Sequence, residues 1–264
     1  MVAIELEGQV AVLTGGSRGI GARAVQLLAA AGANVVFTYR RDGSAARSVL
    51  QAARQAGGNS PASRVVALRA DATRPAASRR LIAEAVRRFG RVDIAIANAG
   101  MWKAEDLAVE RITPGQWRAM LAANLDSAYA LAAAAVAQMK RQRTPRGRPP
   151  GRIIFVASTA AQRGEALHAD YAAAKGGVIA LARGLSTEVA RQGILVNVVA
   201  PGWVDTDMSA PILRSRPAPV LAKIPLGRVG RPEELAGCIL FLCTPWSNFM
   251  TGSVLSANGG AVLA

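Results

Sequence analysis

The stretch that decides the fold is Val10-Ala-Val-Leu-Thr-Gly-Gly-Ser-Arg-Gly-Ile-Gly21, in which an apolar run gives way to closely spaced glycines. The run over 10–14 predicts a buried strand, and the periodic apolar residues after the glycines predict an amphipathic helix. The apolar face of that helix consists of Ile20, Ala24, Leu27, Leu28 and Ala31. A strand, a glycine turn and a helix in this order suit an anion, because the helix N-terminus presents free N–H groups and a positive potential.

The glycine turn predicts a dinucleotide site. Gly15 permits the tight turn, and Gly19 and Gly21 let the backbone approach a pyrophosphate and let the helix pack closely on the sheet. The expected contacts are Gly15, Ser17, Arg18, Gly19, Ile20 and Gly21. The same letters also match the G-x-S-x-G nucleophile elbow of α/β-hydrolases, which would make Ser17 a nucleophile with His168 as the sole histidine for its triad.

Strand-like runs and helix-periodic stretches alternate from this unit to the end of the chain. The alternation predicts parallel strands joined by right-handed helical crossovers, and uninterrupted apolar runs indicate a sheet covered on both faces. The expected fold class is α/β, a doubly wound Rossmann-type parallel sheet of about seven strands with helices on both faces, forming a single domain over 1–264. The strands are expected at 10–14, 34–38, 65–69, 94–97, 153–157, 195–199 and 253–256.

Local signals mark helix starts and two irregular segments. Residues 113–116, Thr-Pro-Gly-Gln, predict an N-cap with a capping-box glutamine, and residues 232–234, Pro-Glu-Glu, predict a second helix start with acids in its first turn. The basic stretch 142–151 predicts a surface loop. The stretch 201–231 contains several prolines, and a segment of that length without regular structure is typical of a lid over a binding site.

Composition limits the classes of function. The 264 residues carry a net charge of +15, and only four of the 32 basic residues are lysine. No basic strip interleaved with aromatics and no known nucleic-acid motif accompanies this charge, so we expect no nucleic-acid partner. The sequence shows neither a signal peptide nor a membrane span of roughly 18 uncharged apolar residues, which predicts a cytoplasmic protein without a membrane partner. With a lone histidine, Cys238 and Cys243 are expected to be buried thiols, and no metal site is expected.

The tip of the second predicted strand distinguishes two nicotinamide cofactors. In dinucleotide folds, a carboxylate about 20 residues after the glycine turn accepts the ribose 2′-hydroxyl of NAD. Tyr39 occupies that place here, and Arg40 and Arg41 follow it, with Arg18 within reach from the glycine turn. Guanidinium groups suit a 2′-phosphate, so NADP is favoured over NAD.

Two acids near these strand ends have competing interpretations. Asp42 has nearly the spacing of an NAD carboxylate, but it precedes Gly43 and is expected to cap the next helix or form a turn. Asp71 follows the third predicted strand and would either hold the adenine edge or serve as a turn residue.

Motifs spread along the chain resemble the short-chain dehydrogenase/reductase family. They appear in order as Thr14 to Gly21, Asn98-Ala99-Gly100, Asn124, Ser158, Tyr171-Ala-Ala-Ala-Lys175, and Pro201-Gly202 leading to Thr206. The resemblance covers Gly8 to Gly260, and the stretches 171–177 and 197–208 look most like the 3-oxoacyl-acyl carrier protein reductases. One departure is Ala97, where the family often has a second Asn, which puts one cofactor-side contact in question.

The resemblance implies a role for each matched residue. Tyr171 would be the general acid in ketone reduction, and Lys175 would stabilise the phenolate, lower its pKa and bond the nicotinamide ribose. Ser158 would hold the carbonyl oxygen. Asn124 would interrupt its helix and position a water linked to Lys175, or else be a buried Asn satisfied by backbone. Cofactor contacts are further implied for Asn98, Gly100, Pro201, Gly202 and Thr206.

Substrate and partners are less constrained. Residues 127–164 and 208–232 contain bases and no acids, which suggests a positive rim that steers an anionic carrier of a small carbonyl substrate, such as a carrier protein or a coenzyme A thioester. His168, three residues before Tyr171, would face either the substrate entrance or, as we expect, solvent. The resemblance also implies a homotetramer or homodimer. The alternative to an enzyme is a non-catalytic Rossmann-type sensor of NADP(H).

Overall fold

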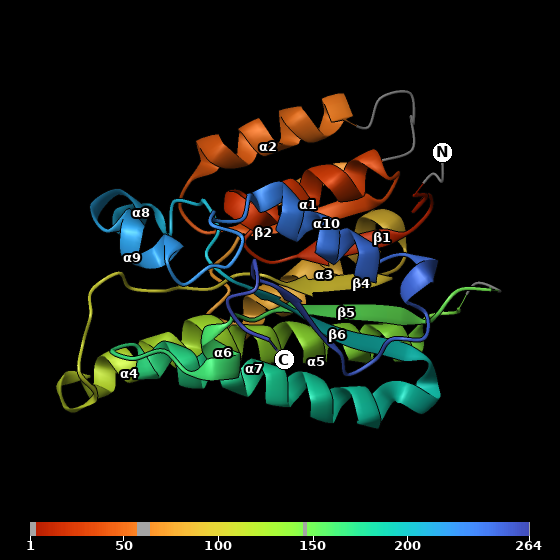
Figure 1. Ribbon diagram of the computed structural model, residues 1–264. Helices are drawn as coiled ribbons and strands as arrows, with labels where there is room; N and C mark the ends of the chain where they lie inside the picture. Colours follow the sequence, from red (N-terminus) through yellow and green to blue (C-terminus); the bar gives the residue numbers. More distant parts are fainter. Residues whose placement is uncertain (1–3, 57–63, 145–146, 264) are drawn as a thin grey trace.

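Seven parallel strands form one sheet in the order β3-β2-β1-β4-β5-β6-β7 in the computed structural model, which describes residues 4–56, 64–144 and 147–263 (Figure 1). The strands are β1 Val10–Leu13, β2 Asn34–Tyr39, β3 Val65–Arg69, β4 Ile94–Ala97, β5 Gly151–Val156, β6 Ile194–Pro201 and β7 Val254–Ala257. Every predicted strand is present, and the boundaries differ by at most two residues at either end. The predicted fold class is therefore confirmed.

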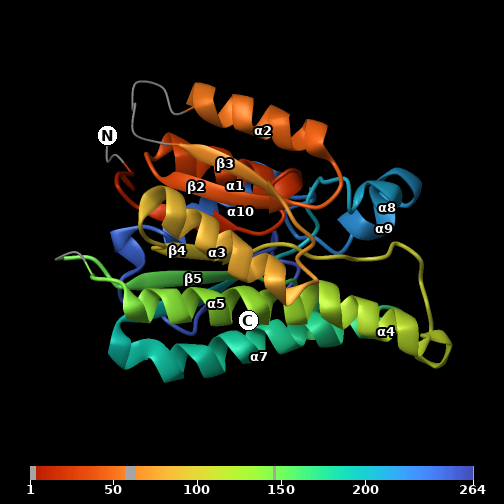
Figure 2. The same cartoon turned by 180° about the vertical axis from the view of Figure 1, so that it is seen from behind.

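Helices cover both faces of this sheet (Figures 1 and 2). One face carries α1 Gly19–Ala30, α2 Gly43–Ala56 and α10 Pro232–Leu242, and the other carries α3 Pro75–Phe89, α5 Ser127–Arg141 and α7 Ala169–Val189. Each layer has its own apolar core, because successive side chains of a strand point to opposite faces. The remaining α-helices are α4 Pro114–Leu121, α6 Ala160–Arg163, α8 Ala210–Ser215 and α9 Pro217–Leu221.

The strand order reverses between β1 and β4. From β1 the chain proceeds through α1 to β2 and β3 on one side, and from β4 it proceeds to β5, β6 and β7 on the other. In open parallel sheets, a crevice forms outside the carboxyl ends of the strands where the order reverses. The turn that follows β1 and the residues that follow β4, β5 and β6 all lie at that edge.

The two predicted helix starts have different outcomes. The Thr113 hydroxyl accepts the backbone N–H of Gln116 at 3.1 Å, as a cap should. The Gln116 side chain does not complete a capping box; it donates to Asp170 at 3.0 Å and accepts from Lys103, so that part of the prediction was wrong. At α10 the Glu234 carboxylate accepts the N–H of Arg231 at 2.7 Å, so the predicted helix start is present with its acids in the first turn.

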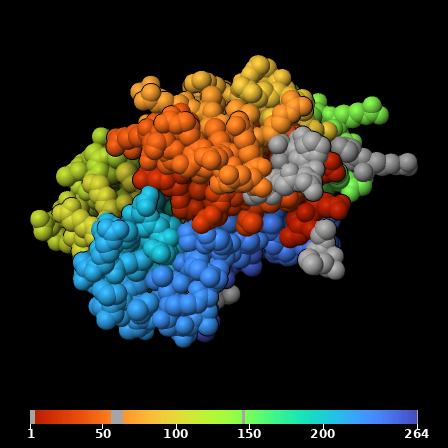
Figure 3. Space-filling view, turned by 90° about the horizontal axis from the view of Figure 1, so that it is seen from above, coloured from red at the N-terminus to blue at the C-terminus, as the bar shows by residue number. Residues whose placement is uncertain are grey.

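The segment 201–231 is more regular than predicted. It contains α8 and α9, and a parallel bridge joins Val204 to Gly230. Short helices form there because proline is tolerated in the first turn of a helix, where its missing N–H has no helical partner. Figure 3 shows this segment, in blue, beside the yellow-green part of the chain.

The basic loop 142–151 lies at the amino-terminal edge of the sheet, and its residues 145–146 fall outside the described part of the chain. It is held at both ends. Gln142 exchanges two hydrogen bonds with the backbone of Val92, at 3.0 and 2.7 Å, and Arg148 donates to the carbonyl oxygen of Glu7.

One long helical stretch, Pro114–Arg141, is apolar enough to cross a bilayer by length and composition alone. Half of its apolar window is buried inside the protein, and it packs against α3 and α7 in the core of one layer. Cys243 is buried and Cys238 half-buried, and burial raises the pKa of both thiols, to about 12 for Cys243. The expectation of unreactive thiols agrees with these surroundings.

Candidate active site

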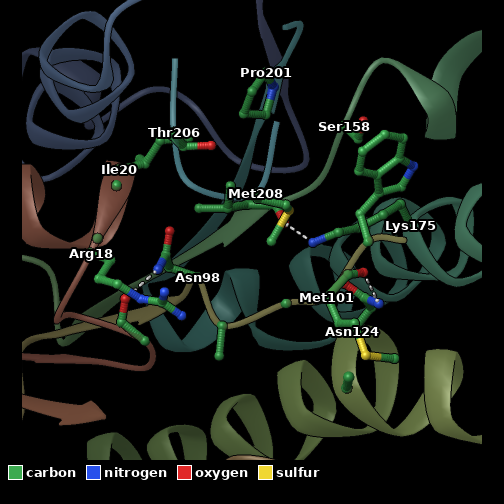
Figure 4. A pocket seen from close by; sticks show the side chains of 18 of the residues that line it. Arg18, Ile20, Asn98, Met101, Asn124, Ser158, Lys175, Pro201, Thr206 and Met208 are labelled. Atoms are coloured by element: carbon green, nitrogen blue, oxygen red, sulfur yellow. Dashed lines mark hydrogen bonds between the residues drawn. The ribbon is translucent and has the colours of Figure 1, made fainter. Parts of the chain in front are cut away.

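A cleft of about 540 Å³ opens at the carboxyl ends of the central strands. It is lined by the turn after β1, by residues that follow β2 to β6, and by α7. Of the predicted site residues, all but Arg41 line it. Figure 4 shows Arg18 and Ile20 on one side of the cleft and Ser158 and Lys175 on the other. The fold thus brings the glycine turn and the predicted catalytic residues to a single cavity.

The glycine turn is shaped as an anion cradle. Gly15 and Gly19 adopt left-handed φ angles of +72° and +53°, and a Cβ on Gly21 would lie 2.2 Å from the carbonyl oxygen of Gly15. The first turn of α1 contains no acid, and Arg18 at its N-cap makes no side-chain cap. The free N–H groups of this helix end therefore fit a pyrophosphate, and no side chain fills their place.

Asn98 ties the ends of the two central strands together. Its amide nitrogen donates to the carbonyl oxygens of Thr14 and Gly15 at 3.1 and 3.0 Å. In return, the Thr14 hydroxyl accepts the backbone N–H groups of Asn98 and Ala99. These bonds fix the glycine turn against the end of β4.

The far end of the cleft carries Tyr39, Arg40 and Asp71. Asp42 accepts the backbone N–H of Ala45 at 2.8 Å and thereby caps α2, as predicted. Asp71 accepts both the backbone N–H and the hydroxyl of Thr73, so it forms a turn while it lines the cleft. Tyr39 lines the cleft at the end of β2, the place where NAD enzymes carry a carboxylate.

Lys175 is a buried ammonium at the catalytic end. Its side chain comes from the middle of α7 and is 5 % exposed, and its Nζ donates to the carbonyl oxygen of Val156 at 2.8 Å. Burial lowers the pKa of Lys175 to about 8. A lysine with that pKa exchanges its proton near neutral pH.

Tyr171 behaves differently from the expectation. Burial raises the pKa of its phenol to about 12, the Ser158 hydroxyl opposes that rise, and the charge of Glu165 adds to it. The Nζ of Lys175 lies 6.0 Å from the ring centroid and is bonded to Val156. The predicted lowering of the Tyr171 pKa was therefore wrong, because loss of hydration outweighs the hydrogen bond with Ser158.

Asn124 sits in a one-turn π-helix, Ala122–Asp126, between α4 and α5. The predicted interruption of regular helical bonding is thus present. Its side chain is 1 % exposed; its amide nitrogen donates to the carbonyl oxygens of Met101 and Met120, and its oxygen accepts the N–H of Met101 (Figure 4). Backbone satisfies this side chain, the alternative that the sequence left open.

Gly100 gives Asn124 and Lys175 their room. A Cβ there would lie 2.7 Å from the amide oxygen of Asn124 and 3.3 Å from Nζ of Lys175. Any larger residue would push these two side chains out of place. The sequence placed Gly100 near the cofactor, and its packing role comes from the tertiary structure alone.

Sequence reasoning missed an aromatic and sulfur-rich part of the cleft. Trp102 and Trp203 meet edge to face with centroids 5.6 Å apart, and Met101 and Met208 line the same cavity. The available signal was position: Met101 and Trp102 directly follow the motif at 98–100, and Trp203 and Met208 lie within or just after the stretch 201–206.

His168 is buried, and the expectation of a solvent-facing histidine was wrong. It is 7 % exposed, its ring lies 5.0 Å from that of Trp102, and its Nε2 lies 3.4 Å from the Asp106 carboxylate. Trp102 and Asp106 are far from His168 in the sequence, so the burial of this histidine could not be predicted from its neighbours in the chain. Across the described ranges Ser17 and His168 share no hydrogen bond, so the hydrolase alternative gains no support.

The expected basic rim is misplaced in its first part. Arg148 lies before β5, at the opposite edge of the sheet from Ser158, and Arg152 is buried in β5 and bonded to Ser247 and Asn248. Parallel strands start at the edge away from the site, so bases that precede β5 cannot border it. Arg146 lies outside the described residues. Of the second interval, Arg216 pairs with Asp106, and Arg228 and Arg231 pair with Glu234.

Comparison with known proteins places these features in a family. Residues 15–262 match the family model described as enoyl-(acyl carrier protein) reductase. The chain is 35% identical over 257 residues to the 3-oxoacyl-[acyl-carrier-protein] reductase of Salmonella typhimurium, covering 97% of this chain and 98% of that protein. The corresponding Escherichia coli reductase is also 35% identical, over 258 residues, with the same coverage. A dehydrogenase/reductase structure from Sinorhizobium meliloti superposes with a TM-score of 0.88 at 33% identity, covering 99% of this chain and 98% of that one.

Proposed function

The chain belongs to the short-chain dehydrogenase/reductase family of oxidoreductases, and we propose that it is an NADP(H)-dependent enzyme that reduces a ketone to an alcohol. The observation that carries this proposal is the placement of Tyr171, Lys175 and Ser158 in one cleft with a glycine turn shaped for a pyrophosphate. A protein that only senses NADP(H) would need the glycine turn but not Tyr171, Lys175 and Ser158.

The cofactor would be held along the cleft. The N–H groups at the start of α1 would bind the pyrophosphate, and the residues at the ends of β2 and β3 would surround the adenosine. When bound, the reduced nicotinamide supplies a hydride. The remaining contacts proposed from the family motifs are Ser17, Asn98, Gly100, Pro201, Gly202 and Thr206, all of which line the cleft.

NADP is preferred over NAD in this proposal because of charge at the end of β2. Tyr39 and Arg40 line the cleft where NAD enzymes place a carboxylate, and Arg18 lines it from the glycine turn. Arg18 also pairs with Asp207 at 3.3 Å across an exposed surface, a contact worth little that a phosphate can replace. Arg41 does not line the cleft, so we assign no contact to it.

Tyr171 would donate the proton. With its pKa raised to about 12 the phenol is protonated at neutral pH, as a general acid for ketone reduction must be. The phenol would give its proton to the carbonyl oxygen of a bound ketone, and the Ser158 hydroxyl would donate a hydrogen bond to that oxygen. Lys175 would then stabilise the phenolate by charge, and the Asn124 turn would hold the wall of the cleft beside it.

The relatives suggest a substrate class. Several carry the name 3-oxoacyl-[acyl-carrier-protein] reductase, so a 3-oxoacyl thioester on an anionic carrier is a candidate. Within the described residues of the 201–231 segment, which we propose as the substrate lid, Arg214 and Lys223 are exposed and make no ion pair. They would meet such a carrier. We further propose a cytoplasmic homotetramer or homodimer.

The proposal is tested by comparing the purified chain with its Tyr171→Phe variant. We expect the chain to oxidise NADPH when a ketone is added, screened over acyl thioesters, quinones, sugars and steroids. The variant should keep NADPH affinity in calorimetry and lose at least about a hundredfold in kcat, as expected for loss of a general acid. Cofactor binding without turnover of any ketone by the unsubstituted chain would support the sensor instead.

A further inference from the structure

The catalytic end of the cleft is walled by the indole pair Trp102 and Trp203. Trp102 follows β4, Trp203 follows β6, and their rings meet at an interplanar angle of 89°. The Trp102 ring also lies against His168, which is three residues before Tyr171 in the chain. The two indoles line the same cleft as Tyr171 and Ser158, where a ketone would react.

Neighbouring side chains restrict the movement of this wall. The ring of Trp102 contacts both His168, with centroids 5.0 Å apart, and Trp203. His168 approaches Asp106, and Asp106 accepts a hydrogen bond of 2.9 Å from Arg216 in the 201–231 segment. Flat surfaces that are held in place can stack on a planar group without first losing side-chain freedom.

The charges of the cleft restrict what lies beside the ketone. Of the bases that line it, Arg18 and Arg40 belong to its cofactor end, and Lys175 is bonded to Val156. Among the acids that line the cleft, Glu165 acts on Tyr171 by its charge, and it pairs with Arg163 at 2.5 Å. A carboxylate next to the carbonyl would find no free cation among the lining residues, and a sugar would leave hydroxyl groups against indole rings and thioethers.

We propose that the group on the ketone carbon is planar and apolar, an aryl or fused-ring group that stacks on one ring of the Trp102–Trp203 pair and meets the other ring at its edge, rather than a linear alkyl chain. This rests on the proposed ketone reduction and deepens it. A 3-oxoacyl thioester whose acyl group ends in an aromatic ring would fit both this proposal and the substrate class that the relatives suggest.

The test uses three esters that differ only in the group on the ketone. Ethyl benzoylacetate carries a planar ring, ethyl cyclohexanoylacetate a ring of similar bulk that is not planar, and ethyl butyrylacetate a linear chain. We expect kcat/KM with NADPH to be at least about tenfold higher for the benzoyl ester than for either of the others, which corresponds to the upper range of an aromatic pair. Equal or higher kcat/KM for the linear ester would overturn the proposal.

Substitutions locate the effect. Trp102→Leu and Trp203→Leu should each reduce kcat/KM for the benzoyl ester about tenfold and reduce that for the linear ester by a clearly smaller factor, and Trp102→Phe should restore most of the loss. Trp117→Leu is the matched control, because this tryptophan is exposed on α4 and does not line the cleft. Similar losses for all three esters in the Leu variants would contradict a stacking role.

Binding separates this inference from the function on which it rests. The affinity of the complex with NADPH for the benzoyl ester is measured by calorimetry, with and without Trp102→Leu. If none of the esters is reduced but the benzoyl ester binds and the variant weakens that binding about tenfold, the ketone-reductase function fails and the aromatic site stands. If reduction occurs without a preference among the esters, the aromatic site fails and the function stands.

Discussion

The ammonium nitrogen of Lys175 lies 6.0 Å from the centroid of the Tyr171 ring, one turn away on the same helix. Burial drives the two groups toward their neutral forms: it lowers the pKa of the lysine to about 8 and raises that of the phenol to about 12. Of the two groups, only Lys175 therefore changes its charge near neutral pH.

Reduction should therefore decline in mild alkali. As the pH rises through about 8, Lys175 loses the proton with which it would stabilise a phenolate, so kcat/KM for the ketone should fall above that pH. Lys175→Arg should be slower but show no fall near pH 8, because a guanidinium stays charged. The measurement is a pH–rate profile of both proteins; a profile of the unsubstituted chain that is flat to pH 10 would contradict the assignment.

The same pKa shift predicts a pH-dependent gain in stability from Lys175→Met. The lysine pKa of about 8 lies below its ordinary 10.5, so the unfolded state binds more protons between these values and the buried ammonium destabilises the fold below pH 8. The shift corresponds to about 3 kcal/mol, and loss of the bond to Val156 offsets about 1. Urea unfolding at fixed protein concentration should show the variant about 2 kcal/mol more stable at pH 7. The gain should disappear by about pH 10.5, and a gain independent of pH would rule out this cause.

Gly21 should tolerate no side chain. Gly21→Ala places a methyl group 2.2 Å from a backbone oxygen and 2.5 Å from the Asn98 amide, so the glycine turn must open. We expect a loss of NADPH affinity of at least about tenfold and a lower melting temperature. The matched control is Gly237→Ala in α10, where a Cβ meets nothing within 4 Å; it should keep full affinity and gain about 0.5–1 kcal/mol.

Cofactor choice should depend on Arg40 and not on Arg41. Arg40 lines the cleft and its neighbour does not. Arg40→Ala should weaken NADPH binding about tenfold and leave NADH binding nearly unchanged, because only the phosphate would be lost as a partner. Arg41→Ala should affect neither. Calorimetric titration with both nucleotides decides the matter, and equal weakening of the two by Arg40→Ala would argue against a 2′-phosphate contact.

Asp106 should fix the 201–231 segment against the wall of the cleft. It pairs with Arg216 at 2.9 Å and with His168 at 3.4 Å. Asp106→Asn should raise KM several-fold more than it lowers kcat, and chymotrypsin should cut the 201–231 segment faster. Glu105→Gln is the control, since this neighbouring acid is exposed and forms no ion pair with any described residue. An Asp106→Asn protein with unchanged KM and cleavage would dismiss the contact as incidental.

The sheet, the parallel direction of its strands and the place of the cleft could all be predicted from local patterns along the chain. Apolar runs and helical periodicity depend on residues close in the chain, and the order of strands at a glycine turn leaves few topologies. Several motif residues could be assigned to the cleft for the same reason, because they stand at the carboxyl ends of strands that meet at one edge. Asn124, Tyr171 and Lys175 lie in helices instead, and the family resemblance assigned them.

The tertiary structure alone decided the surroundings of individual side chains. Gln116 bonds Asp170, 54 residues away, His168 is covered by Trp102, and Arg148 lies at the far edge of the sheet. The pKa of Tyr171 was predicted with the wrong sign because Lys175 is visible in the sequence, while the packing that removes water is not. Near neighbours fix backbone conformation, whereas burial and charge come from contacts that only the folded chain brings together.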